Sequence, residues 1–210
     1  MYTVMVANTA VMMTDVDITA RAYKSKMNHL EDYMTFMKLP KALRMRISDY
    51  FQARYAGKWY DEKDVLKWVS SSLREDIMMS ICSSHVRKVP IFRNRDVNFI
   101  NAILLELQYE VFQGGDIIIY RNGPGDRMFL IEHGQVLVEN EFFQRELCDG
   151  DYFGETCLLT RGRHLATVKA LTICQLFSLS VDSFHHVMED YPDIKRDMEI
   201  SQSDKNILLC

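Results

Sequence analysis

The sequence predicts an α+β protein: a helical region, then an antiparallel β-roll of jelly-roll-like type with flanking helices. Three observations predict this class. Apolar residues step by three and four through residues 14–90, which is the period of amphipathic helices. Beyond residue 107, short β-type runs separated by Gly-containing turns replace that period. Apolar helical steps return after residue 181, so helices are expected to follow the roll.

Pro and Gly residues divide the first half into separate helices. Thr14 and Asp17 form a capping-box-like start, and Pro40 ends the helix that follows. The next helix is expected to stop at Gly57. The helical ranges predicted in this half are about 14–39, 41–56, 61–69, 72–82 and 95–107.

The second half contains six runs with strand-like composition. They are YEVF, DIIIY, MFLIE, QVLVEN, ATVKAL and CQLFSLS, and turn signals such as Gly114-Gly115 and Asp149-Gly150 separate them. Many short strands with regular turns indicate a small antiparallel roll or sandwich. Two helices are expected after them, one near Val181 and one at Pro192, which is a favourable first helical residue.

Charge is distributed unevenly along a chain whose net charge is −4. Residues 1–95 hold 16 Lys and Arg against 10 Asp and Glu, whereas the remainder holds 9 against 19. This asymmetry predicts two modules with different surroundings and argues against a nucleic-acid partner. The apolar stretch 1–14 lacks the basic residues of a signal peptide, and a bilayer span needs about 20 apolar residues. It fits either a buried helix or the end of a longer membrane helix.

Cysteine usage predicts a reducing compartment. The five cysteines are odd in number, and no C-x-x-C pair occurs among them. Cys82 and His85 lie one helical turn apart, but no second pair completes a metal site. We therefore predict ordinary thiols and no bound metal.

The stretch FGETCLLTRGRHLA, residues 153–166, together with the Gly-punctuated strands and closing helices, resembles a cyclic-nucleotide-binding domain. The segments EDYMTFMKLP, DYFQARYAGKWYDEKDVL and LREDI resemble the C-linker of hyperpolarization-activated cyclic-nucleotide-gated (HCN) channels. This resemblance implies three parts: the cytoplasmic end of the last pore helix at 1–13, a helical C-linker at 14–90, and a cyclic-nucleotide-binding-like domain at 91–205.

The resemblance also assigns roles within the pocket. Gly154 allows close approach of the backbone to the cyclic phosphate, and free N–H groups after it would face that phosphate. Glu155 would accept a hydrogen bond from the ribose 2′-hydroxyl. Gly154, Glu155 and Cys157 match the family pattern.

Three departures from the pattern predict a degenerate pocket. His164 and Leu165 stand where the family has a phosphate-binding Arg and a Thr or Ser, and Arg145 stands where the purine wall is apolar. Arg163 is the alternative phosphate partner, but on a strand its side chain would face away from that of His164. The last helix, DIKRDMEISQSDK, is about two turns shorter than the family's lid helix and lacks its distal basic residues.

The implied function is the cytoplasmic gating and assembly module of a homotetrameric voltage-gated cation channel with a degenerate, weak or non-functional pocket. The C-linker would join the subunits below a transmembrane pore of the same polypeptide, on the cytoplasmic side of the plasma membrane. The alternative is a working domain that responds to cyclic AMP or cyclic GMP through an atypical pocket. A third reading has a side chain of the protein filling the pocket. No cofactor is expected to be required, and binding of either nucleotide is expected to be weak or absent. The sequence has no metal-ligand cluster and no paired catalytic carboxylates, which argues against an enzyme.

Overall fold

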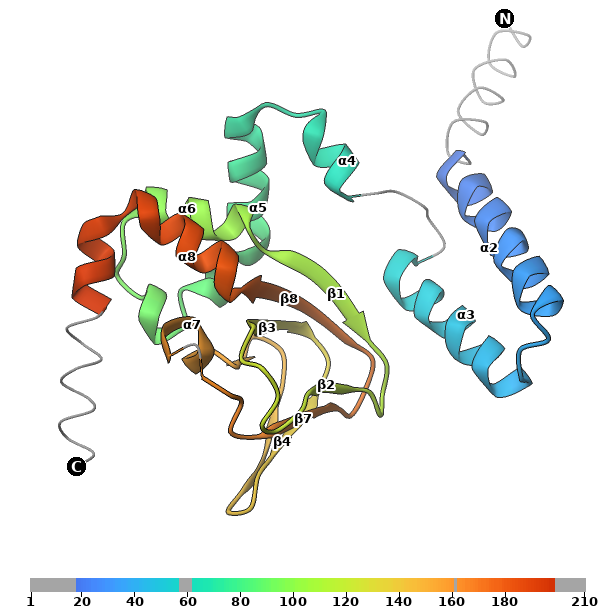
Figure 1. Cartoon of the computed structure of the whole chain (residues 1–210). Coiled ribbons are helices and arrows are strands. Elements are labelled where there is room, and N and C mark those ends of the chain that lie inside the picture. Colours follow the sequence, from blue (N-terminus) through green and yellow to red (C-terminus); the bar gives the residue numbers. More distant parts are fainter. Residues whose placement is uncertain (1–17, 57–61, 161, 199–210) are drawn as a thin grey trace, which may run out of the picture. The chain divides into compact units, whose positions relative to one another are not determined.

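The computed structural model describes residues 18–56, 62–160 and 162–198, and the chain forms two compact units (Figure 1). The first unit ends at Ser70 and the second begins at Ser71. The expected end of a pore helix at 1–13, and the capping box at Thr14, lie outside the described residues.

The first unit contains helices α2 (Ile18–Phe36), α3 (Lys41–Tyr55) and α4 (Glu62–Lys67). Between α2 and α3, the Arg44 Nε donates to the carbonyl of Leu39 at 2.9 Å. Helix α3 ends one residue before the predicted limit, because Ala56 adopts a left-handed conformation with φ 47° and donates its N–H to Gln52. Among the described residues, no helix combines the length and apolarity that a bilayer span requires.

The second unit joins helices to a β-roll. Its helical elements are α5 (Ser71–Val86), the short 3₁₀ helix η1 (Pro90–Phe92), α6 (Val97–Leu105), α7 (Thr156–Thr160) and α8 (Val181–Asp190). Residues 192–198 are also helical. Helices α5, α6 and α8 gather at one end of the roll (Figure 1). There the rings of Phe92, Phe99 and Phe184 pack together, with centroids 6.1 to 6.3 Å apart.

The roll consists of two four-stranded antiparallel sheets, which confirms the predicted α+β class. The first sheet has the order β1-β8-β3-β6 and the second β2-β7-β4-β5. The strands are β1 (Gln108–Phe112), β2 (Ile117–Ile119), β3 (Arg127–His133), β4 (Val136–Glu139), β5 (Gln144–Leu147), β6 (Tyr152–Phe153), β7 (Thr167–Ala170) and β8 (Cys174–Ser180).

The core of the roll draws on both sheets. Phe129 of β3 stacks on Phe153 of β6, with ring centroids 5.2 Å apart, and both side chains are buried. Ile119, Val136 and Val168 of the other sheet belong to the same apolar cluster. Burial of side chains from both sheets holds one sheet against the other.

Helix α5 belongs to the second unit, although the sequence resemblance assigns it to the C-linker. It lies against α6 and β3, and the His85 Nδ1 is 3.5 Å from the Glu132 Oε2. The division between Ser70 and Ser71 separates two compactly packed units and does not mark functional parts. The functional boundaries expected at residues 13/14 and 90/91 therefore stay predictions.

Candidate functional site

A cavity of about 380 Å³ lies over the inner face of the β2-β7-β4-β5 sheet. One wall is a row of residues paired across all four strands. Ile119 pairs with Val168, Val168 with Val138, and Val138 with Arg145. All four line the cavity, so the wall is apolar until its last strand, where it ends in a guanidinium.

Strand β5 shows why Arg145 faces the cavity. Phe143 and Leu147, two residues to either side of Arg145, line the same cavity. Alternate residues of a strand point to the same face, so Arg145 and Leu147 of β5 share one direction. The Arg145 side chain is exposed, whereas Leu147 is buried.

Gly154 turns the chain from β6 into α7 and sets the position of Glu155. Its φ of +80° lies in the left-handed region, and an added Cβ would meet the Arg127 carbonyl oxygen at 3.1 Å. Both conformation and space therefore favour glycine. Glu155 lines the cavity. Burial, and then the Glu155 charge, raise the pKa of the neighbouring Tyr152 hydroxyl.

His164 forms part of the opposite wall. Its backbone N–H donates to the Gly123 carbonyl at 3.1 Å, and its carbonyl accepts from the Asn122 N–H at 2.9 Å. These bonds hold a side chain that is only 9% exposed. Burial lowers the pKa of the imidazole below its ordinary 6.5, and the nearby Asp126 carboxylate opposes this only in part. The imidazole is therefore neutral at physiological pH.

The residues beside His164 lie differently. Leu165 lines the cavity at its rim and is 76% exposed, so it contributes an apolar edge and no hydroxyl. The Arg163 guanidinium donates to the Asn122 carbonyl at 2.6 Å and is not part of the cavity wall. The suggestion that Arg163 replaces the missing phosphate partner stays a prediction, and it would require this bond to break.

The ionisable lining is poorly matched to an anion. Among the described lining residues, Asp151 and Glu155 supply two carboxylates, Arg145 supplies one guanidinium, and His164 is neutral. The Asp151 carboxylate already accepts the Cys148 N–H at 3.0 Å. The net charge of this lining is negative, which opposes a phosphodiester by like-charge repulsion.

Five of the seven residues that the sequence singled out line one cavity: Arg145, Gly154, Glu155, His164 and Leu165. Arg163 and Cys157 do not line it. Cys157 is buried in α7, and burial raises the pKa of its thiol to about 11.

Sequence reasoning missed two ionisable lining residues, namely Asp151 and Tyr152. Tyr152 directly precedes the quoted motif. In the described ranges 18–56, 62–160 and 162–198, no three His, Cys, Asp or Glu side chains cluster as metal ligands would.

Comparison with known proteins shows the family to which this chain belongs. The family model described as "Cyclic nucleotide-binding domain" matches residues 109–191. Over 205 residues, 97% of this chain, the sequence is 42% identical to potassium/sodium hyperpolarization-activated cyclic nucleotide-gated channel 4 of Oryctolagus cuniculus and of Homo sapiens. The chain is a C-linker and cyclic nucleotide-binding domain of the HCN-like type. It is also 41% identical, over the same length, to channel 1 of Homo sapiens.

The HCN-like chain spans only part of these relatives. It covers 17% of the channel 4 sequences and 23% of the human channel 1 sequence. The relatives bear the names of channels and not of enzymes. The matches confirm the resemblance predicted from FGETCLLTRGRHLA and from the preceding helices, and they identify the chain as a regulatory domain of this type.

Proposed function

We propose that this HCN-like chain is the cytoplasmic gating and assembly module of a homotetrameric voltage-gated cation channel, at the plasma membrane, with a nucleotide pocket that is degenerate, weak or without function. The observation that carries the proposal is the buried His164 in the cavity wall, at the position where the resemblance implies a phosphate-binding Arg. The role in the channel rests on the similarity to HCN channels 1 and 4.

The size of the defect follows from hydrogen-bond strengths. A guanidinium can make two parallel charge-assisted bonds to a phosphate, each worth about 1.5–3 kcal/mol. A neutral imidazole offers one uncharged donor. Loss of the bidentate pair therefore weakens binding by at least about ten- to a hundredfold. Leu165 adds no hydroxyl to compensate.

The second candidate function is a working receptor for cyclic AMP or cyclic GMP. It is favoured by the retained Gly154 turn and by Glu155, which lines a cavity within the size range of small-molecule sites, about 300–1,000 Å³. In this case Arg145 would compensate for the neutral His164.

Titration with fluorescent analogues of cyclic AMP and cyclic GMP at pH 7.4 separates the two functions. The degenerate pocket is expected to show no saturation at micromolar nucleotide. Saturation in that range, lost in Glu155→Gln and in Arg145→Ala, would establish the working receptor instead. Exposed Glu189 provides the matched control, because Glu189→Gln also removes one carboxylate charge but lies on α8.

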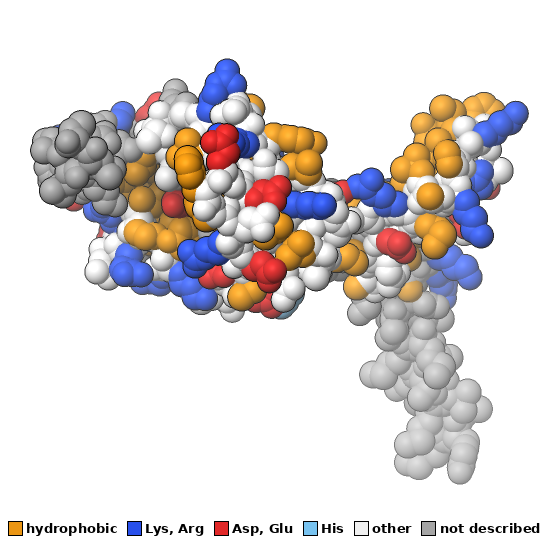
Figure 2. Space-filling model, turned by 90° about the horizontal axis from the view of Figure 1, so that it is seen from below, with side chains coloured by type: hydrophobic (Ala, Val, Ile, Leu, Met, Phe, Trp, Pro, Cys, Tyr) orange, Lys and Arg blue, Asp and Glu red, His pale blue; other side chains and the backbone are white. Residues whose placement is uncertain are grey.

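The C-linker unit supports the proposal of assembly. Helix α3 has no buried residue, and Met34 is the only buried residue of α2. Phe36 is 82% exposed, and Met45 is also exposed. Hydrophobic and charged side chains are interspersed at the surface in Figure 2. Where exposed apolar side chains such as these adjoin one another, they mark interaction sites in soluble proteins.

Sedimentation velocity over a range of concentrations tests the assembly. We expect concentration-dependent association of the chain, weakened by the double change Phe36→Ser and Met45→Ser. Phe142→Ser is the control, because Phe142 is equally exposed but lies in the β4–β5 turn of the roll. A parent chain that is monomeric at every concentration would contradict assembly through this unit.

A further inference from the structure

A second cavity lies on the other side of His164. It has a volume of about 310 Å³ and is formed by residues of β1, β2, β3 and the turn between β2 and β3. His164 and Ile119 line both cavities, so they form the partition between them. Neither the nucleotide pocket nor the proposed assembly uses this second space.

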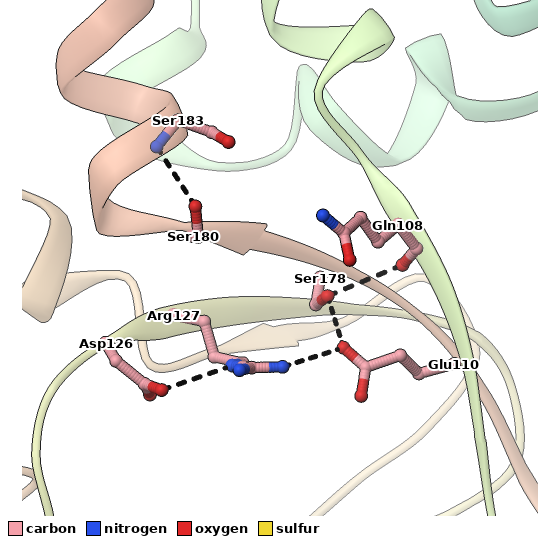
Figure 3. Close-up of polar contacts among 7 residues, drawn as sticks. All are labelled: Gln108, Glu110, Asp126, Arg127, Ser178, Ser180 and Ser183. Carbon is pink, nitrogen blue, oxygen red and sulfur yellow. Dashed lines mark hydrogen bonds and ion pairs between the residues drawn. The ribbon is translucent and has the colours of Figure 1, made fainter.

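One wall of the second cavity is ionic. The Arg127 guanidinium lies between two carboxylates, with its Nη1 3.1 Å from the Glu110 Oε1 and its Nε 3.4 Å from the Asp126 Oδ2 (Figure 3). The Ser178 hydroxyl donates to the same Glu110 oxygen. One guanidinium thus faces two carboxylates, and this wall keeps a net negative charge.

The other side of the cavity is aromatic. Phe112 and Phe129 pack edge to face with centroids 6.1 Å apart, and Tyr120 is exposed at the rim. All three line the cavity. Aromatic faces next to carboxylates favour a cation that has an apolar body, because the ring quadrupole and the carboxylates both attract positive charge.

His164 contributes a polar side chain to the lining of this cavity. The residue is only 9% exposed, but its ring nitrogens are not among the fully buried polar atoms that lack a hydrogen-bond partner. A neutral imidazole that faces this cavity can accept an N–H from a bound molecule.

We propose that the second cavity binds a small organic cation of the arylalkylammonium class. The ammonium group lies against Glu110 and Asp126 and donates to His164, and the aromatic body packs on Phe112 and Phe129. The volume is near the lower end of small-molecule sites, about 300 Å³, so the ligand is small. This site is independent of whether the neighbouring cavity binds a nucleotide.

Imidazole NMR of the whole chain with isotope-labelled histidine tests the site. Phenethylammonium chloride is the probe, and 2-phenylethanol is its uncharged analogue, both titrated at pH 7.4 and constant ionic strength. His164→Gln assigns the resonance. We expect a saturable shift of the His164 signal with phenethylammonium at millimolar concentration, and an affinity for the alcohol that is lower by about tenfold.

Variants locate the cation in one of the two cavities. Asp126→Asn keeps the shape of an exposed side chain and should weaken phenethylammonium about three- to fivefold without changing the alcohol. Tyr120→Ala should weaken both probes, and Asp190→Asn, on α8, should change neither.

The absence of a saturable shift would overturn the proposal, as would equal binding of both probes. Loss of cation binding in Glu155→Gln but not in Asp126→Asn would also overturn it, because the cation would then occupy the first cavity.

Discussion

Replacing His164 by Arg and Leu165 by Thr should give the pocket a phosphate clamp. The rest of that end of the cavity is in place, with Gly154 in its left-handed turn and Glu155 in the wall. Arg supplies a planar fork with two aligned donors, and Thr supplies a hydroxyl where Leu165 offers only carbon.

The gain follows from the two bonds and the cost of burying the new charge. Two charge-assisted bonds contribute about 3–6 kcal/mol in total. Position 164 is nine-tenths buried, so desolvation of a guanidinium offsets several kcal/mol of this, and the Asp126 carboxylate reduces that loss. We expect a net gain of about 2 kcal/mol, which is roughly thirtyfold in affinity. Family-level affinity is not expected, because Arg145 still interrupts the apolar wall.

Titration with a fluorescent cyclic AMP analogue measures this gain in the parent, both single variants and the double variant. Adding Glu155→Gln to the double variant should remove most of the gain if the ribose lies against that carboxylate. An unchanged affinity in the double variant would refute the reasoning and place the defect in the purine wall or in the lid helix.

Three further outcomes are expected. Burial lowers the pKa of His164 in the folded chain, so this imidazole binds a proton at higher pH in the unfolded chain than in the folded one. The free energy of unfolding should therefore fall as pH drops below about 6.5 towards the folded pKa. His164→Gln should flatten this dependence in urea unfolding measured between pH 5 and 7.5, and an unchanged slope would contradict it. Phe129→Ala should cost about 3–5 kcal/mol in the same assay, because it removes a ring stacked in the core. Phe142→Ala, at an exposed position, should cost less than about 0.5 kcal/mol, and similar losses in both variants would argue against this core. Iodoacetamide at pH 8 should label the exposed Cys148 and spare Cys157, which is buried with a raised pKa, and peptide mapping that finds both labelled would show that α7 opens.

Local patterns were sufficient to predict most elements of the fold. The change from helical steps to short Gly-separated runs marks the beginning of the roll. Strands β2, β4, β7 and β8 fall within the predicted runs, and β1 and β3 extend one residue beyond theirs, β3 at both ends. Strand β6, Tyr152–Phe153, was not predicted, because two residues carry no period. It exists through pairing with β3, which is a non-local contact.

The candidate site was predictable in its residues but not in its environment. Arg145, His164 and Leu165 could be found by comparing motifs, and the two-residue period of β5 explains the direction of Arg145. The burial of His164 depends on backbone bonds to Asn122 and Gly123, in a turn far away in sequence. No local pattern encodes that contact, so neither the neutral imidazole nor the second cavity could be anticipated.

The order of strands in the two sheets has a consequence for synthesis on the ribosome. Within the described residues, β1 has β8 as its only sheet neighbour and β2 has only β7, whereas β4 and β5 form a hairpin from adjacent sequence. While residues before 167 are being made, the hairpin can form, but β1 and β2 have no strand to pair with. The roll therefore closes late, once β7 and β8 have left the exit tunnel. A nascent chain that stalls before this point exposes the unpaired edges of β1 and β2. Such edges favour binding by chaperones or aggregation, because the incomplete roll cannot cover them.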